Sequence, residues 1–249
     1  MNAWVDAFAN AREQLLAPKY LGWLLDGWCM TIGASLLVIV ASTALGLVFA
    51  AARGSPRAGL RRATAVYVSL FRNTPLLVQL FFWYFGAPSL LPEAAREWLN
   101  AGHHVSVAGV RLHWPSFEFL TAIVGLVLYA TAYVGEEIRA GIRGVPVAQV
   151  HAGMAMGFSA AQVQRHVVLP QAVRIALAPL FGQYMNIVKN TSLAMAVGLV
   201  ELSYTSRQVE ADTFKTFQAF GFATLFYIAT IALLEWTSAW AVRHTRVKA

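Results

Sequence analysis

A run of 26 residues between Asp26 and Arg53 contains no charged side chain. A helix that crosses the hydrocarbon core of a membrane, which is about 30 Å thick, needs about 20 consecutive apolar residues. The run is therefore long enough to span a bilayer. This one segment favours an integral membrane protein over a soluble domain.

The composition of the whole chain agrees with a membrane protein. Hydrophobic residues make up 58% of the chain and charged residues only 12%, and the mean hydropathy is +0.55, whereas soluble domains carry about 25% charged residues. The net charge of +7 could suggest nucleic acid as a partner, but basic residues that cluster beside long apolar runs are typical of topology signals. We therefore expect membrane lipid and no nucleic acid. The single cysteine, Cys29, excludes an intrachain disulfide and a cysteine-based metal site.

Four further apolar runs follow the first. We expect an all-α integral membrane fold with five transmembrane helices in a single domain over residues 1–249, with spans at about 27–52, 64–90, 117–138, 175–200 and 216–242. Arg72 is the only charged residue in the second span and Lys189 the only one in the fourth.

Five spans place the two chain ends on opposite sides of the membrane. Of the 19 Lys and Arg residues, eleven fall in the loops 53–62 and 136–174 and in the C-terminal tail, and six fall in the other set of loops. The positive-inside rule then predicts a cytoplasmic C-terminus and an N-terminus outside. Trp236 and Trp240 suit an aromatic belt at the cytoplasmic face.

The largest cytoplasmic loop, at about 140–173 between the third and fourth spans, has a helical pattern on both sides of a Gly-Phe-Ser sequence. Val147, Val150 and Met154 recur at helical spacing. Gly157 can adopt the left-handed conformation that ends a helix, and Ser159 can cap the next helix. The pattern predicts two short helices that meet at a turn. They either dock another protein or lie on the bilayer surface.

This loop resembles the EAA loop of ABC importer permeases. The family pattern is a Glu-Ala-Ala trio, a Gly, nine free positions and an Ile-x-Leu-Pro end. Gly157, the nine-residue gap and Leu169-Pro170 match, whereas His151 stands at the Glu position and Gly153 at the second Ala.

In that family the loop forms coupling helices that sit in a cleft of an ATP-binding subunit. The resemblance implies the same role for Gln149, His151, Ala152, Gly153, Gly157, Leu169 and Pro170. The sequence contains no Walker lysine motif. ATP and Mg²⁺ are therefore expected on a partner subunit, and no cofactor or metal is expected in this chain.

Three further segments resemble the polar amino acid branch of these permeases. They are Leu70–Gln79, Leu169–Arg174 and Ile187–Leu193, and the first is similar to the Phe-Arg-Gly-Thr-Pro signature with Asn73 in place of Gly. Within the branch the chain looks most like glutamate/aspartate permeases. The resemblance implies ATP-binding subunits, a periplasmic solute-binding protein, a second permease subunit in a homodimer or heterodimer, and a place in the bacterial inner membrane.

The two intramembrane cations point to a substrate path on physical grounds. A Lys or Arg at mid-depth costs about 2.5 to 3.5 kcal/mol on insertion scales, so it normally faces a polar cavity or a partner. The alternative is that Arg72 and Lys189 snorkel to opposite interfaces or pair with carboxylates such as Glu201. The predicted substrate residues are Lys189, Asn190, Thr191, Ser192, Asn186, Arg72, Thr74 and Gln79. Lys189 and Arg72 would bind carboxylates, and Asn190, Thr191 and Ser192 would supply hydrogen bonds.

The prediction is thus a permease subunit of an ATP-driven importer of polar amino acids, and not an enzyme. A membrane enzyme would need a nucleophile and base, or metal ligands, within the spans. An ion-coupled secondary transporter would need Asp, Glu or His in the apolar cores of the spans, which contain none. These two classes, or another non-transport membrane protein, are the alternatives.

Overall fold

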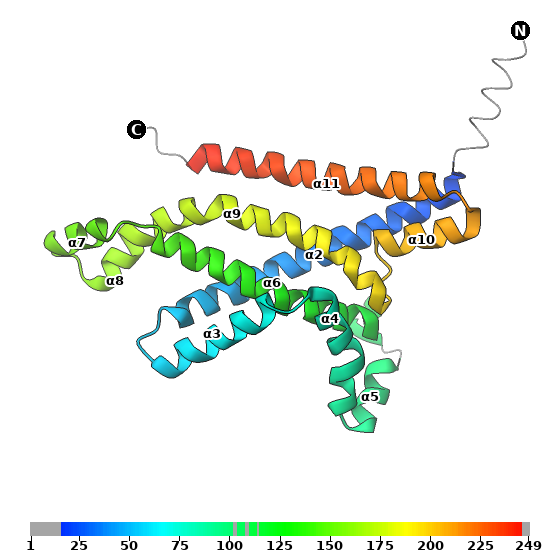
Figure 1. Ribbon diagram of the computed structural model, residues 1–249, viewed down its shortest axis with the longest axis horizontal. Helices are drawn as coiled ribbons and strands as arrows, with labels where there is room; N and C mark the ends of the chain where they lie inside the picture. Colours follow the sequence, from blue (N-terminus) through cyan, green and yellow to red (C-terminus); the bar gives the residue numbers. More distant parts are fainter. Residues whose placement is uncertain (1–15, 102–103, 108–109, 114, 246–249) are drawn as a thin grey trace, which may run out of the picture. The chain divides into compact units, whose positions relative to one another are not determined.

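The computed structural model of the chain describes residues 16–101, 104–107, 110–113 and 115–245 (Figure 1). The predicted position of the N-terminus concerns residues outside this part. The first elements are α2 (Pro18–Arg53), α3 (Ala58–Arg72), α4 (Leu76–Phe81), the π-helical turn η1 (Phe82–Gly86), the 3-10 turn η2 (Ala87–Leu90), α5 (Glu93–Asn100), β1 (His104–Val107) and β2 (Val110–His113). They are followed by α6 (Phe117–Arg143), α7 (Val147–Ala155), α8 (Ala160–Val163), the π-helical turn η3 (Gln164–Val168), α9 (Leu169–Asn190), the 3-10 helix η4 (Thr191–Val197), α10 (Leu202–Thr213) and α11 (Thr216–Thr245).

The helices confirm the all-helical character of the fold but do not establish five spans. Among the described residues, α2, α6 and α11 are long and apolar enough to cross a membrane, and α3 with the helical segment 76–90 forms a fourth only if the interrupted pair is one span. The predicted fourth span corresponds to α9, which is not among the helices that are long and apolar enough to cross a membrane. Its polar residues, among them Gln171, Arg174, Gln183, Asn186 and Lys189, lower its hydropathy.

The helix bounds extend beyond the predicted spans. Helix α2 begins at Pro18 and not near residue 27, so Lys19 and Asp26 lie within it. The Lys19 ammonium lies 4.7 Å from the centroid of the Trp23 ring, an arrangement that stabilises a cation near a helix end. The charged residues therefore mark where the apolar run begins, but the helix itself begins before them.

A small hairpin is added to the helical fold within the predicted outer loop. Strands β1 and β2 pair antiparallel, with His104 opposite His113 and Val107 opposite Val110. The sequence analysis predicted only a loop here.

The chain divides into two compact units, each made of three segments. Unit 1 comprises the chain up to Leu36 together with Leu77–Val124 and Val188–Thr230, and unit 2 comprises Leu37–Leu76, Gly125–Ile187 and the chain from Ile231 onward. Helices α2, α6, α9 and α11 each contribute residues to both units.

The core of unit 1 joins the first half of α2 to α10 and α11. Leu24, Leu202 and Val209 have no exposed surface and pack in one cluster. Beside them the Trp28 ring stacks on Phe226 and its indole N–H donates to the Thr230 hydroxyl at 2.8 Å. Buried tryptophan is favourable where its N–H finds a partner in this way.

Glu201 is a fully buried carboxylate in unit 1. It caps α10 by accepting a hydrogen bond from the Tyr204 backbone N–H at 2.8 Å, and it accepts another from the Tyr227 hydroxyl at 2.8 Å. Thr31 donates to the same carboxylate at 3.4 Å and accepts from the Leu202 N–H at 3.1 Å. The carboxylate therefore connects α2, α10 and α11.

In unit 2, α2 approaches α6 closely through two glycines. A Cβ on Gly46 would lie 3.1 Å from the Gly135 nitrogen, so a larger residue would separate the helices. The ring of Tyr67 on α3 packs at a tilt against the rings of Phe49 and Phe71, with both centroid distances 4.5 Å. Its hydroxyl donates to the Leu128 carbonyl of α6. These contacts join α2, α3 and α6.

Gly141 of α6 contacts α9 in unit 2, and Gly141→Ala is expected to destabilise the fold. The new Cβ would lie 2.7 Å from the Ala172 carbonyl oxygen and 2.7 Å from the Ala176 Cβ. Forcing extra volume into a packed contact costs about 1 to 3 kcal/mol. The measurement is the thermal unfolding midpoint of the purified protein in detergent. Gly182→Ala is the matched control, because no atom lies within 4 Å of its added Cβ; an equal loss of stability in both variants would contradict the packing argument.

Candidate functional site

The second predicted span is interrupted at Asn73–Pro75. Helix α3 ends at Arg72, and the next helix begins at Leu76. Pro75 has no N–H to donate into a continuing helix, and the Asn73 N–H closes α3 by donating to the Ser69 carbonyl at 3.2 Å. Pro75 therefore lies at a break in the helix beside Arg72.

Arg72 is exposed and lies against two tyrosines of α6 that the sequence analysis did not select. Its guanidinium carbon lies 5.1 Å from the centroid of the Tyr133 ring. The Tyr129 hydroxyl donates to the Tyr133 hydroxyl at 3.1 Å, and the Tyr133 hydroxyl is 3.4 Å from the Arg72 carbonyl oxygen. A cation over an aromatic face keeps its outer N–H groups available for an anion. The spacing of four residues between the tyrosines is the signal in the sequence that could have indicated this pair.

The end of α9 presents the second predicted cation. Lys189 and Asn186 are exposed, and Asn190 is half-buried. Among the described residues Lys189 forms no ion pair within 4.0 Å, and Glu201 is bound by Tyr204, Tyr227 and Thr31 instead. The alternative in which Lys189 pairs with Glu201 therefore has no support.

Thr191 and Ser192 donate their hydroxyl hydrogens to the backbone. The Thr191 hydroxyl donates to the Val188 carbonyl at 2.8 Å, and the Ser192 hydroxyl donates to the Lys189 carbonyl at 2.7 Å. Thr191 is also fully buried. In this conformation the hydroxyl of Ser192 can only accept a further hydrogen bond, so the available donors in this segment are Lys189 and Asn190.

The predicted substrate residues are divided between the two units. Arg72, Thr74 and Asn186 belong to unit 2, whereas Gln79, Lys189, Asn190, Thr191 and Ser192 belong to unit 1. Thr74 is half-buried and donates to the Leu70 carbonyl at 2.9 Å. Gln79 is buried. A single site made of these residues remains a prediction.

The predicted coupling loop folds as two short helices joined at Gly157. This residue has a φ of +86°. Its N–H donates to the Met154 carbonyl at 3.0 Å, and the N–H of Phe158 donates to the Gly153 carbonyl at 3.2 Å, which is the Schellman arrangement that ends a helix. Ser159 then forms a capping box with Gln162 at the start of α8. The predicted turn chemistry is confirmed at both positions.

Gly153 is the one buried residue among those predicted for coupling. A Cβ on it would lie 3.0 Å from the Val163 Cγ2 atom. Val163 belongs to a small core with Val145, Val168 and Ala172. Gly153 stands at the second Ala position of the EAA pattern, where an added Cβ would lie this close to Val163.

The other predicted coupling residues lie on the surface. Gln149, His151, Ala152, Gly157, Leu169 and Pro170 are exposed. Large apolar side chains are exposed beside them, including Val147 at 64% and Met156 at 74%. Exposed apolar side chains that gather on one element are typical of a protein or membrane contact.

A family model described as "Binding-protein-dependent transport system inner membrane component" matches residues 42–247. The chain belongs to this family. It is 33% identical to the glutamate/aspartate import permease protein GltJ of Escherichia coli (strain K12) over 215 residues, which cover 86% of this chain and 84% of GltJ. It is 33% identical to the probable glutamine ABC transporter permease protein GlnM of Bacillus subtilis (strain 168), with 82% and 84% of the two chains covered.

Solved structures agree with this family fold. An amino acid ABC transporter solved with histidines matches with a TM-score of 0.77 at 23% identity, covering 91% of this chain and 95% of that one. The methionine ABC transporter MetNI in an inward-facing conformation matches with a TM-score of 0.73 at 16% identity, covering 93% and 100%. As an inner membrane component of a transport system, the chain is a transport subunit and not an enzyme.

Proposed function

We propose that the chain is the permease subunit of an ATP-driven importer of polar amino acids, and that glutamate and aspartate are its substrates. The observation that carries this proposal is the 33% identity to the glutamate/aspartate permease GltJ across 86% of the chain. Glutamine permeases among the relatives support the wider class of polar amino acids.

An anionic amino acid requires a cation and hydrogen-bond donors along its path. Lys189 supplies an exposed ammonium at the end of α9, with no ion pair to another described residue. Asn190 follows it with an amide that can donate. In the proposal Lys189 and Asn190 bind a carboxylate of the substrate. Within unit 2, Arg72, held against the Tyr133 ring at 5.1 Å, offers a second cation to an anionic substrate.

The loop of α7 and α8 is proposed to dock the ATP-binding subunit. Exposed Val147, Met154 and Met156 supply apolar contact area, and His151 is exposed beside them on α7. The capped turn at Gly157 and Ser159 keeps the two helices in a defined arrangement. Such an element can transmit a movement of the partner as a rigid body.

The remaining parts of the assembly follow from the family. We propose a second permease subunit, either a copy of this chain or a related one, and a periplasmic solute-binding protein that delivers the substrate. The C-terminus is proposed to be cytoplasmic and the N-terminus outside, on the basis of the distribution of Lys and Arg.

The proposal is tested by transport in reconstituted vesicles. The chain is co-expressed with its ATP-binding and solute-binding partners, and uptake of radiolabelled glutamate is measured with and without ATP in the vesicles. ATP-dependent uptake that unlabelled aspartate competes for is the expected result. Uptake that is independent of ATP, or that only a neutral or cationic amino acid competes for, would contradict the proposal.

Lys189→Met is expected to reduce glutamate uptake about tenfold to a hundredfold, because a charge-assisted hydrogen bond contributes about 1.5 to 3 kcal/mol. Methionine keeps a similar length and removes only the charge and the donors. The yield of assembled complex should not fall, since no ion pair of Lys189 with a described residue is lost.

Lys189→Arg is the matched control for charge and is expected to retain most of the uptake. A fall in complex yield equal to the fall in uptake would assign Lys189 a structural role. Normal uptake by the Met variant would exclude it as a substrate ligand.

A further inference from the structure

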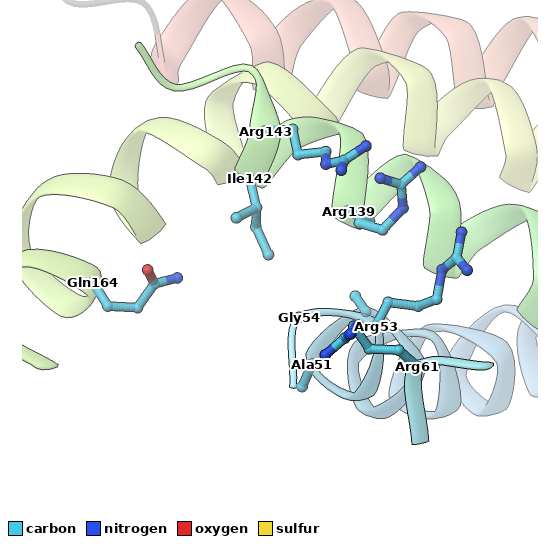
Figure 2. Close-up of a pocket in the computed structure, with 9 residues that line it drawn as sticks. Ala51, Arg53, Gly54, Arg61, Arg139, Ile142, Arg143 and Gln164 are labelled. Carbon is cyan, nitrogen blue, oxygen red and sulfur yellow. The ribbon is translucent and has the colours of Figure 1, made fainter. Parts of the chain in front are cut away.

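Unit 2 contains a cavity of about 670 Å³ that residues of α2, α3, α6 and η3 line (Figure 2). Arg53 lines it from the end of α2 and Arg61 from the first turn of α3, and Arg139 and Arg143 line it from the end of α6. Ile142 and Gln164 point into the space between these elements. Ligand cavities in proteins commonly measure about 300 to 1,000 Å³.

Two of the four arginines, Arg53 and Arg139, share a single acidic partner among the described residues. Glu136 lies 3.3 Å from the Arg53 Nε atom and accepts from the Arg139 Nε atom at 3.0 Å. Its side chain is 12% exposed. One carboxylate between two guanidinium groups leaves an excess of positive charge in the cavity wall.

The other two arginines have no carboxylate partner among the described residues. Arg61 donates from one nitrogen to the Ser55 and Pro56 carbonyls at 3.0 and 2.9 Å, which holds the guanidinium at the turn. Arg143 lies in the last turn of α6 and is exposed. An arginine held in place with further N–H groups unused presents a planar donor set that matches phosphate.

The position of the cavity indicates the source of the phosphate. It lies at the ends of α2 and α6, two helices that are long and apolar enough to cross a membrane. The ends of such helices lie at the depth of the lipid headgroups. Large apolar side chains are exposed on the adjacent turns, with Leu47 and Val48 on α2 and Leu60 and Val66 on α3. A lipid can therefore place its headgroup among the arginines and its acyl chains on this apolar surface.

We propose that this cavity binds the phosphate headgroup of an anionic phospholipid. Arg61 and Arg143 bind the phosphate oxygens, and Arg53 and Arg139, held by Glu136, add long-range positive potential. The bound lipid then bridges the α2–α3 turn and the end of α6. A soluble phosphate would share the headgroup contacts but would gain nothing from the exposed apolar side chains.

The test measures lipid binding to the purified full-length protein in detergent, with phosphatidylglycerol and phosphatidylcholine as probes and native mass spectrometry as the readout. The double variant Arg61→Gln/Arg143→Gln should lower the affinity for phosphatidylglycerol by about tenfold or more. The matched control Arg57→Gln/Arg62→Gln removes two exposed arginines of the same turn that do not line the cavity. The affinity of this control variant should stay within about twofold of that of the unmodified protein, because neither Arg57 nor Arg62 lines the cavity.

Three results would overturn the proposal. Equal losses in the two double variants would assign the binding to the general basic surface. Binding of inorganic phosphate as tightly as phosphatidylglycerol would identify a soluble anion as the ligand. A cavity variant that keeps the lipid but no longer co-purifies with the ATP-binding subunit would make the arginines a protein contact.

Discussion

Glu201→Ala is expected to lower the free energy of unfolding by about 3 to 5 kcal/mol, the range for removing one partner of a buried charged network. The change removes the acceptor of the Tyr204 N–H and of the Tyr227 hydroxyl, each at 2.8 Å, and leaves both donors in a buried region. It also removes the N-cap of α10. The measurement is the thermal unfolding midpoint of the purified protein in detergent, together with the amount of folded protein recovered from membranes.

Glu201→Gln is the matched control, because the amide keeps one acceptor oxygen and the volume of the side chain. Burial raises the pKa of the Glu201 carboxyl, although the hydrogen bonds from Ser203, Tyr227, Tyr204 and Thr31 act against this effect. A neutral amide should therefore replace it at a smaller cost than alanine. If the Ala and Gln variants unfold at the same temperature as the unmodified protein, the carboxylate does not connect α2, α10 and α11.

The importance of Glu201 could not be predicted from the sequence. Its hydrogen-bond partners Thr31 and Tyr227 are 170 and 26 residues away along the chain. Only the folded arrangement of α2 and α11 brings them to the carboxylate. In the sequence alone, the only indication of a role for Glu201 is its charge, which is opposite to that of Lys189.

The long apolar helices could be predicted from their own residues alone. The uncharged runs located α2, α6 and α11, because an apolar helix of this length needs no partner to reveal its position. The turn at Gly157 was predicted because a glycine in the left-handed conformation ends a helix through its own backbone. Helix α9 was predicted as a helix, but with its polar residues it is not among the helices that are long and apolar enough to span a membrane.

The candidate site was predicted less completely than the helices, because its side chains depend on contacts that only the fold determines. Lys189 is exposed and forms no ion pair among the described residues, as the proposed substrate role requires. The hydroxyls of Thr191 and Ser192 are instead bound to the backbone. A hydroxyl that donates within its own turn cannot be distinguished in a sequence from one that faces a cavity. The arginines of the α2–α3 turn and of α6 were counted as topology signals, and their convergence on one cavity required the fold.

Gly157→Val is expected to abolish the stimulation of ATP hydrolysis by the substrate-loaded binding protein, while the chain still inserts into the membrane. Gly157 has a φ of +86°, a conformation that a β-branched residue adopts only at a cost of about 1 to 3 kcal/mol. Relief of this strain would change the angle between α7 and α8 and would displace the exposed apolar side chains of α7. The measurements are ATPase stimulation and uptake in reconstituted vesicles, beside the yield of the complex.

Gly157→Asn is the matched control, because it adds a side chain at the same position with much less backbone strain than Gly157→Val. A Cβ built on Gly157 has no atom within 4 Å apart from its chain neighbours, so the added Cβ has space in both variants. Asparagine tolerates the left-handed conformation far better than valine. The Asn variant should retain most of the stimulation that the Val variant loses. Equal activity of the two variants, whether both normal or both absent, would mean that the left-handed turn at Gly157 does not determine how the loop contacts the ATP-binding subunit.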